Sequence, residues 1–232
     1  INKSRLGVGQ QAQGQIEAAF QTSLIYSHER RAGRAPGGAV SPESGADALI
    51  HQPDICRMLM SQKAIAEGGR ALIHWCAKCV DISDLGNAAE QAEAEQLLGL
   101  LIPITKGCLS ELASEMTDYG VQILGGHGYV TEWGLEQRVR DVRVTRIYEG
   151  TTGIQGIDLL ARKITGRGRP AFQKLIDIML SVCSDDVSEK VKPLQRQLTQ
   201  AIAQWRELTD DLEIKAEHDS TLLSAIAVDY LM

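Results

Sequence analysis

Gln122–Gly128 reads QILGGHG, and Arg140–Gln155 reads RDVRVTRIYEGTTGIQ. The adjacent glycines of the first stretch lack Cβ atoms, so backbone N–H groups of this turn can approach an anion such as a phosphate. Gln122 can donate a hydrogen bond to the same anion from its side-chain amide. Glu149 stands between an aromatic residue and a glycine, where apolar surroundings favour its use as a general base. The residues alone leave a second interpretation open, in which the glycines form ordinary turns and Glu149 caps the next helix.

The sequence on both sides of these stretches has the apolar spacing of helices, and the alternation typical of strands is absent. Helices are expected over residues 5–31, 52–80, 87–119, 151–165, 172–182, 187–212 and 221–231. We therefore predict an all-α fold, an up-down bundle of long helices with a smaller helical extension. The bundle is placed at residues 1–166. The extension, which we expect to be incomplete, is placed at residues 167–232.

The composition is that of an ordinary globular protein. Of its 232 residues, 44% are hydrophobic and 23% are charged, which excludes a disordered or collagen-like chain. No apolar run approaches the roughly 18 residues that a membrane span needs, so we expect no membrane insertion. The net charge of −6 disfavours binding to nucleic acid. Because the first residue is Ile1 and no signal peptide follows, we expect a processed chain or a piece of a longer one.

The cysteines and one cluster of basic residues indicate the cellular compartment and the kind of ligand. Five cysteines, an odd number, favour a reducing compartment over a disulfide framework, and we predict a cytoplasmic protein. Cys76 and Cys79 form a C-x-x-C inside a helical pattern, which we interpret as core packing, with no metal site. Eight basic residues against three acidic ones lie between residues 138 and 169. We interpret them as partners in ion pairs and of an anionic ligand rather than as a nucleic-acid surface.

The two stretches resemble the C-terminal signature region of the flavin-dependent acyl-CoA dehydrogenases. The family patterns Q-x-x-G-G-x-G-[YF] and I-Y-E-G-T-x-x-I-Q both occur here, in the family order and spacing. Arg5 and the run YSHER at residues 26–30 resemble the opening of the family's C-terminal helical domain, and the His51-Gln52 pair resembles the start of its second long helix. The resemblance covers residues 1–165. The loop at residues 35–50, the helices after Gly166 and the run EGTTGIQGIDLLARK at residues 149–163 are most similar to the long bacterial branch that includes 3-methylmercaptopropionyl-CoA dehydrogenase-like enzymes. Departures from the family pattern at Arg31–Gly33 and Gly153 imply that the family's flavin contacts are only partly present.

This resemblance implies a reaction and a set of residues. Glu149 matches the glutamate that removes the α-proton of an acyl-CoA thioester while the β-hydrogen leaves as hydride to FAD, which yields a trans-2-enoyl-CoA. Substrate-binding positions of the family match Asn2, Arg5 and Gly150. Positions that contact FAD match Arg30, His51, Gln52, Gln122, Gly125, Gly126 and Thr151. His127 is interpreted as structural.

The family's assembly has further implications. In these enzymes the Q-x-x-G-G turn approaches the ADP part of a flavin held mainly by a neighbouring subunit, which implies a homodimer or homotetramer. An electron-transfer flavoprotein is an expected electron acceptor. Family enzymes also have an N-terminal helical domain and a β-barrel domain, so we expect this chain to be the C-terminal part of a longer enzyme and inactive alone. The alternatives are an acyl-CoA oxidase or a DNA-associated homologue of the same fold, or an inactive helical interaction module.

Overall fold

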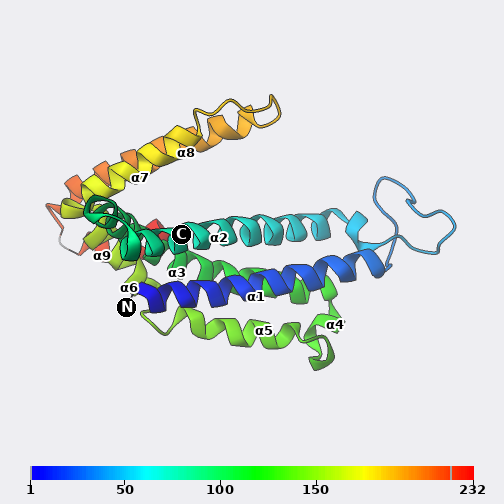
Figure 1. Cartoon of the computed structure of the whole chain (residues 1–232). Coiled ribbons are helices and arrows are strands. Elements are labelled where there is room, and N and C mark those ends of the chain that lie inside the picture. The colour runs from blue at the N-terminus through cyan, green and yellow to red at the C-terminus, as the bar shows by residue number, and fades with distance from the viewer. Residues whose placement is uncertain (1, 220) are drawn as a thin grey trace. The chain divides into compact units, whose positions relative to one another are not determined.

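Helix α1 (Asn2–Glu29) opens a chain that is helical along most of its length (Figure 1). The computed structural model describes residues 2–219 and 221–232, and of Asn2 the backbone only. Within these residues no strand occurs, and Arg31 and Ala48 form an isolated antiparallel bridge. The predicted all-α fold is confirmed.

Four more long helices follow α1: α2 (Pro53–Leu85), α3 (Ala88–Leu124), α7 (Arg169–Val182) and α8 (Lys192–Ala216). The shorter segments are η1 (Leu49–His51), α4 (Gly126–Tyr129), η2 (Thr131–Trp133), α5 (Leu135–Val142), η3 (Arg143–Arg146), α6 (Thr152–Ile157), the π-helical η4 (Asp158–Ile164), η5 (Gly166–Gly168), α9 (Leu222–Ala225) and α10 (Ala227–Leu231).

Two of the predicted helix boundaries in the C-terminal region are wrong. Helix α8 begins at Lys192 rather than at residue 187, because Pro193 lies in its first turn, where a residue without an N–H is best tolerated. The single helix predicted over residues 221–231 is divided at Ile226 into α9 and α10.

The contacts between residues divide the chain into two compact units. One consists of residues 1–76 and 105–152, and the other of residues 77–104 and 153–232. Helices α2 and α3 each contribute to both units. The domain boundary predicted at residue 166 stays a prediction.

The first unit is a bundle in which α1, α2, α3 and α5 alternate in direction (Figure 1). Buried amides join the helices: Gln13 of α1 donates to the carbonyl oxygen of Ala66 in α2 at 2.6 Å. Gln62 of α2 donates in the same way to Met116 of α3 at 2.8 Å. The up-down order predicted for the bundle is therefore present in this unit.

Apolar side chains fill the first unit in two clusters. One cluster comprises Ala19, Phe20, Tyr26, Met58, Leu59, Ile123, Leu124 and Leu135. The other comprises Ala12, Ile16, Ala66, Leu109, Ala113, Met116 and Val142. Both draw residues from α1, α2 and α3, so burial of the apolar faces of these helices holds the bundle together.

Helices α1 and α3 approach closely at Gly9 and Thr105. A Cβ atom on Gly9 would lie 2.8 Å from Cγ2 of Thr105, closer than real Cβ contacts allow, so a glycine is needed at this position. This approach sets the start of α1 against the middle of α3.

In the second unit, α7 and α8 pack against each other in opposite directions. The rings of Phe172 and Trp205 meet edge to face with centroids 4.9 Å apart. The hydroxyls of Thr209 and Tyr230 are 2.6 Å apart and join α8 to α10. Lys174 pairs with Glu93 at 2.6 Å, so residues from the predicted extension contact the first turns of α3.

Among the helices of the described residues, α3 is the one that is long and apolar enough to cross a membrane. Its most apolar window has a mean hydropathy of 1.3, and 67% of that window is buried inside the protein. Burial of this kind is typical of the core helix of a globular fold.

Candidate active site

Glu149 lies in the short loop that joins η3 to α6. Its φ is 53°, the only positive value at a non-glycine position among the described residues, and Gly150 follows with φ of 91°. A left-handed backbone costs a non-glycine residue about 1–3 kcal/mol, so the surrounding contacts must hold this turn. Backbone strain of this kind gathers at active sites, and it singles out Glu149 independently of any motif.

Lys106 of α3 binds this turn from inside the bundle. Its side chain is fully buried, and its Nζ donates a hydrogen bond to the carbonyl oxygen of Gly150 at 2.5 Å. Burial and the nearby charge of Arg5 lower the pKa of Lys106 to about 8, while the carboxylates of Glu111 and Glu149 act in the opposite direction. Lys106 is therefore mostly protonated at neutral pH, and the loop is bonded to a buried ammonium group.

Glu111 of α3 contacts residues at both ends of the same loop. Its Oε1 accepts a hydrogen bond from the hydroxyl of Thr152 at 2.5 Å, and its Oε2 pairs with Arg146 at 2.5 Å. Ser110 donates a hydrogen bond to the carbonyl oxygen of Thr145 at 3.1 Å. Three neighbouring side chains of α3, counting Lys106, thus hold the segment from residue 145 to residue 152.

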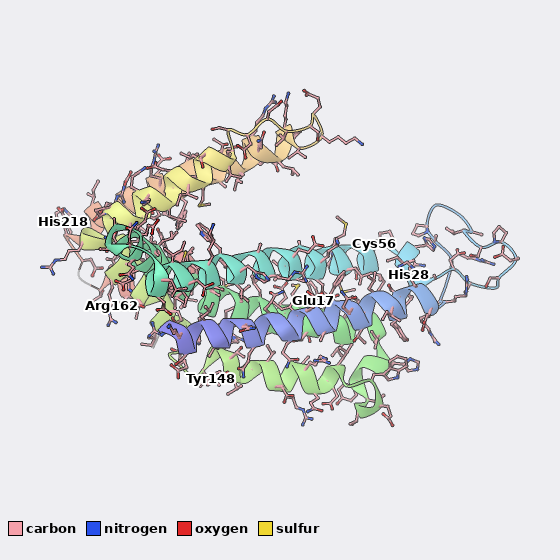
Figure 2. The ribbon with its side chains drawn as sticks, in the orientation of Figure 1. Glu17, His28, Cys56, Tyr148, Arg162 and His218 are labelled. Carbon is pink, nitrogen blue, oxygen red and sulfur yellow. The ribbon has the colours of Figure 1, made fainter. Side chains whose placement is uncertain are left out.

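The predicted substrate-binding residues lie at this end of the first unit, as far as the structure describes them. Arg5 is close enough to Lys106 to lower its pKa, and Gly150 is bonded to Lys106 directly. The hydroxyl of Tyr148 donates a hydrogen bond to the side chain of Gln11, and Figure 2 shows Tyr148 at the N-terminal end of α1. The side chain of Asn2 lies outside the described residues.

The predicted cofactor-binding residues divide into two groups. Thr151 lies two positions after Glu149. The other six lie at the opposite end of the first unit, where Figure 2 shows His28 and Cys56: Arg30, His51, Gln52, Gln122, Gly125 and Gly126. At about 1.5 Å per residue, the 25 positions from Arg5 to Arg30 along α1 span roughly 37 Å. The turn at Glu149 and the glycine turn at Gly125 therefore lie at the two ends of one bundle.

Hydrogen bonds to backbone carbonyl oxygens connect the residues of the group at the opposite end from Glu149. The N–H of Leu49 donates to the carbonyl oxygen of Arg30 at 2.9 Å, which sets the start of α2 beside the end of α1. The amide of Gln52 donates to the carbonyl oxygen of Arg34 at 3.2 Å. Arg30 and His51 are both exposed, so their side chains can reach a ligand at this end.

Asp47 organises the loop between these two helices. Its buried carboxylate accepts hydrogen bonds from the N–H groups of Ala35, Val40 and Ser41, at 2.9, 3.1 and 2.8 Å. These hydrogen bonds, led by that of Ala35, and the charge of Arg34 lower the pKa of Asp47 to about 2. The glycine- and proline-rich segment 34–46 is thus an ordered loop built around one carboxylate.

The glycine turn at the end of α3 is open to solvent. Gly125 has φ of 58° and ψ of −133°, a conformation that residues with a Cβ rarely adopt. A Cβ on Gly125 or Gly126 would meet no atom within 4 Å, so there is free space in front of the turn. His127 lies 3.0 Å from the hydroxyl of Tyr26 and stacks on Trp133 with centroids 5.1 Å apart. His127 thus anchors the turn to α1.

The cysteines and the basic cluster have structural surroundings. Cys76 and Cys79 are buried, and burial raises the pKa of Cys79. Within the described part of the chain, no group of three His, Cys, Asp or Glu residues is placed to hold a metal ion. Four arginines of the basic cluster pair with carboxylates of their own chain: Arg140 with Glu136, Arg146 with Glu111, Arg162 with Asp158, and Arg169 with Asp210 and Glu213.

Comparison with known proteins assigns the class to which this fold and site belong. Residues 1–164 match the family described as acyl-CoA dehydrogenase, C-terminal domain. The chain therefore belongs to the acyl-CoA dehydrogenase family.

Particular relatives narrow the comparison. The chain is 34% identical over 235 residues to 3-methylmercaptopropionyl-CoA dehydrogenase of Ruegeria pomeroyi, with 100% of this chain and 39% of that enzyme aligned. The crystal structure of Caenorhabditis elegans ACDH-11 in complex with C11-CoA matches 99% of this chain and 36% of its own length, with a TM-score of 0.82 and 22% identity. An acyl-CoA dehydrogenase of Bacillus anthracis complexed with FAD matches 99% of this chain and 40% of its own, with a TM-score of 0.68 and 21% identity.

The similarity to the Caenorhabditis elegans and Bacillus anthracis structures concerns the fold alone, and it extends through the C-terminal helices. The chain spans less than half the length of each of these relatives.

Proposed function

We propose that this chain is the C-terminal part of a flavin-dependent acyl-CoA dehydrogenase, in which Glu149 is the base that removes the α-proton of an acyl-CoA thioester. The observation that carries the proposal is the turn at Glu149. A strained, left-handed glutamate is held there by the buried Lys106 and the half-buried Glu111 of α3, at the position where the family motif has its glutamate. Membership of the family supports the reaction class.

In this reaction the chain's own part is to bind, to orient and to take a proton. The carboxylate of Glu149 is exposed and so is accessible to a substrate. Gly150, without a side chain, leaves room for the thioester beside the base, and Arg5 stands at the same end to attract the anionic CoA portion. Bound FAD supplies the acceptor for the β-hydrogen, which leaves with its electron pair. Loss of a proton from Cα and of a hydride from Cβ leaves a trans-2-enoyl-CoA.

The residues at the far end of the first unit fit the diphosphate portion of FAD. The open glycine turn lets backbone N–H groups approach an anion, and Gln122 and Arg30 are exposed donors. Because this end lies roughly 37 Å along α1 from the base, we propose that it binds the FAD of a neighbouring subunit, while Thr151 contacts the flavin that serves Glu149. The enzyme is then a homodimer or a homotetramer.

The remaining partners follow from the reaction. The reduced cofactor must pass its electrons to an acceptor, for which we propose an electron-transfer flavoprotein. The chain has five cysteines, an odd number, which suits the cytoplasmic location that we propose.

Rapid mixing of the holoenzyme with an acyl-CoA, without oxygen, tests this function through the loss of flavin absorbance. The Glu149→Gln variant keeps the shape of the side chain but cannot accept the proton, so flavin reduction should slow by at least about 100-fold. Glu149→Asp, which keeps a displaced carboxylate, should retain part of the rate. Reduction of the Gln variant at nearly the wild-type rate would show that Glu149 is not the base.

A further inference from the structure

We propose that Lys106 is a positioning residue for Glu149: its buried ammonium group binds the carbonyl oxygen of Gly150 and so holds the left-handed turn in which Glu149 faces the substrate. The proposal rests on the proposed function, because Lys106 has this role only if Glu149 is the base. Its experiment separates the two.

The burial of Lys106 is the first argument. It is the only charged residue between Glu95 and Glu111, in an apolar stretch of α3, and its side chain is fully buried. A buried charge is costly unless it is paired and hydrogen-bonded. An apolar residue of similar length would fill the same space without that cost. The hydrogen bond of Lys106 to Gly150 O, made by a strongly charged donor, gives the lysine a role that an apolar residue cannot fill.

The position of that hydrogen bond is the second argument. Glu111 fixes Arg146 and Thr152 at the two ends of the loop, and Lys106 adds a hydrogen bond between these two ends. Lys106 reaches the carbonyl oxygen of Gly150, the residue that immediately follows Glu149. The φ angle is positive at both Glu149 and Gly150, so this hydrogen bond helps to hold a turn that includes a strained residue. Lys106 thus holds the turn at the residue next to the strained Glu149.

The charges around Lys106 support the same role. Arg5 approaches from α1, Glu111 from α3 and Glu149 from the loop. The ammonium group is attracted to the carboxylate of Glu149 as well as to the carbonyl oxygen of Gly150. Both attractions keep the base close to α3.

The test compares Lys106→Met with Lys63→Met in the holoenzyme. Methionine keeps the length of the buried side chain without its donor, and Lys63 is an exposed lysine of α2 that pairs with Glu67. In Lys106→Met we expect the rate of flavin reduction at saturating acyl-CoA to fall about 10- to 100-fold, because a misplaced base loses part of its contribution to the rate. The dissociation constant of the acyl-CoA should change less than threefold.

A second measurement reports the loop directly. Amide hydrogen exchange of a peptide that spans residues 147–151 should become faster in Lys106→Met, and exchange elsewhere in the bundle should stay as in the wild type. A purely structural lysine would slow the reaction only through unfolding, with a lower melting temperature and faster exchange throughout α3. That pattern would overturn the proposal, and so would a wild-type rate together with wild-type exchange.

Chemical rescue checks that the missing donor is responsible. Lys106→Ala leaves space for a small amine, so added ethylammonium should recover part of the rate, whereas tetramethylammonium, which has no N–H, should not. Equal effects of both ions would contradict the proposal. If Glu149→Gln is itself active, the proposed function fails. If Glu149→Gln is inactive but Lys106→Met behaves as wild type, only the role of Lys106 fails.

Discussion

The Nζ of Lys106 and the carbonyl oxygen of Gly150 are 2.5 Å apart, although 44 positions separate them in the sequence. This hydrogen bond connects the most buried part of α3 to the residue that follows Glu149. The buried Lys106 and the strained turn at Glu149 are therefore coupled, so a substitution of Lys106 should change the conformation of the turn.

The stability of the protein should depend on pH through Lys106. Its pKa is about 8 in the folded protein, below the ordinary value of 10.5, so the buried ammonium opposes folding below pH 8. Between pH 8 and pH 10.5 the folded state has lost this proton and the unfolded state still holds it, so the free energy of unfolding should rise with pH. Urea unfolding of the wild type and of Lys106→Met over this range isolates the effect. A constant difference between the two proteins would contradict it.

Substitutions at Gly125 and Gly126 should distinguish an effect on folding from an effect on the proposed cofactor binding. Gly125→Ala should destabilise the protein by about 1–3 kcal/mol, because its backbone conformation is open only to glycine. Gly126 has an ordinary helical conformation and free space at its Cβ position, so Gly126→Ala should leave the melting temperature nearly unchanged.

If the turn binds the diphosphate of FAD, Gly126→Ala should still weaken FAD binding, because the added methyl group stands in the space that the diphosphate would occupy. Titration of the apoenzyme with FAD measures this. Unchanged affinity in Gly126→Ala would place the cofactor elsewhere.

Asp47→Asn should loosen the loop that follows α1. The change removes the negative charge that three backbone N–H groups and Arg34 share, so exchange and proteolysis within residues 35–47 should increase. The pKa of Asp47 is lowered from 3.8 to about 2, so its contribution to stability is present above pH 3.8 and is lost as the pH falls towards 2.

The difference in stability between wild type and Asp47→Asn should therefore shrink over the same acid range. Asp54→Asn, a change at an exposed carboxylate that pairs with Arg57, is the matched control and should have little effect. Equal effects of the two substitutions would rule out the special role of Asp47.

Much of the fold could be predicted from the sequence, because helical periodicity is a local property. The long helices α1, α2 and α3 lie within a few residues of their predicted ranges. The proposal that Glu149 is the base also comes from the sequence, because the spacing of the family motif can be read from the chain. What periodicity could not supply was the division into two units, which depends on contacts that α2 and α3 make along different parts of their length.

The residues that support Glu149 were missed for a related reason. Lys106 and Glu111 lie about 40 residues before the loop that they hold, and neither belongs to a motif. One signal was present in the sequence, a single lysine within the apolar run of α3. A charged side chain is costly to bury among apolar residues unless it is paired, so this lysine requires a partner inside the fold. The pairing of that lysine with Gly150 could come only from the three-dimensional structure.

The central claim is that Glu149 removes the α-proton, and hydrogen exchange at that carbon of the substrate tests it most directly. An acyl-CoA analogue with a sulfur atom in place of the β-carbon cannot transfer a β-hydride, so in D₂O the holoenzyme can only exchange its α-hydrogens. We expect the wild type to incorporate deuterium at Cα, as measured by mass spectrometry, and Glu149→Gln to do so at least about 100-fold more slowly. Exchange at the wild-type rate in Glu149→Gln would contradict the assignment of Glu149 as the base.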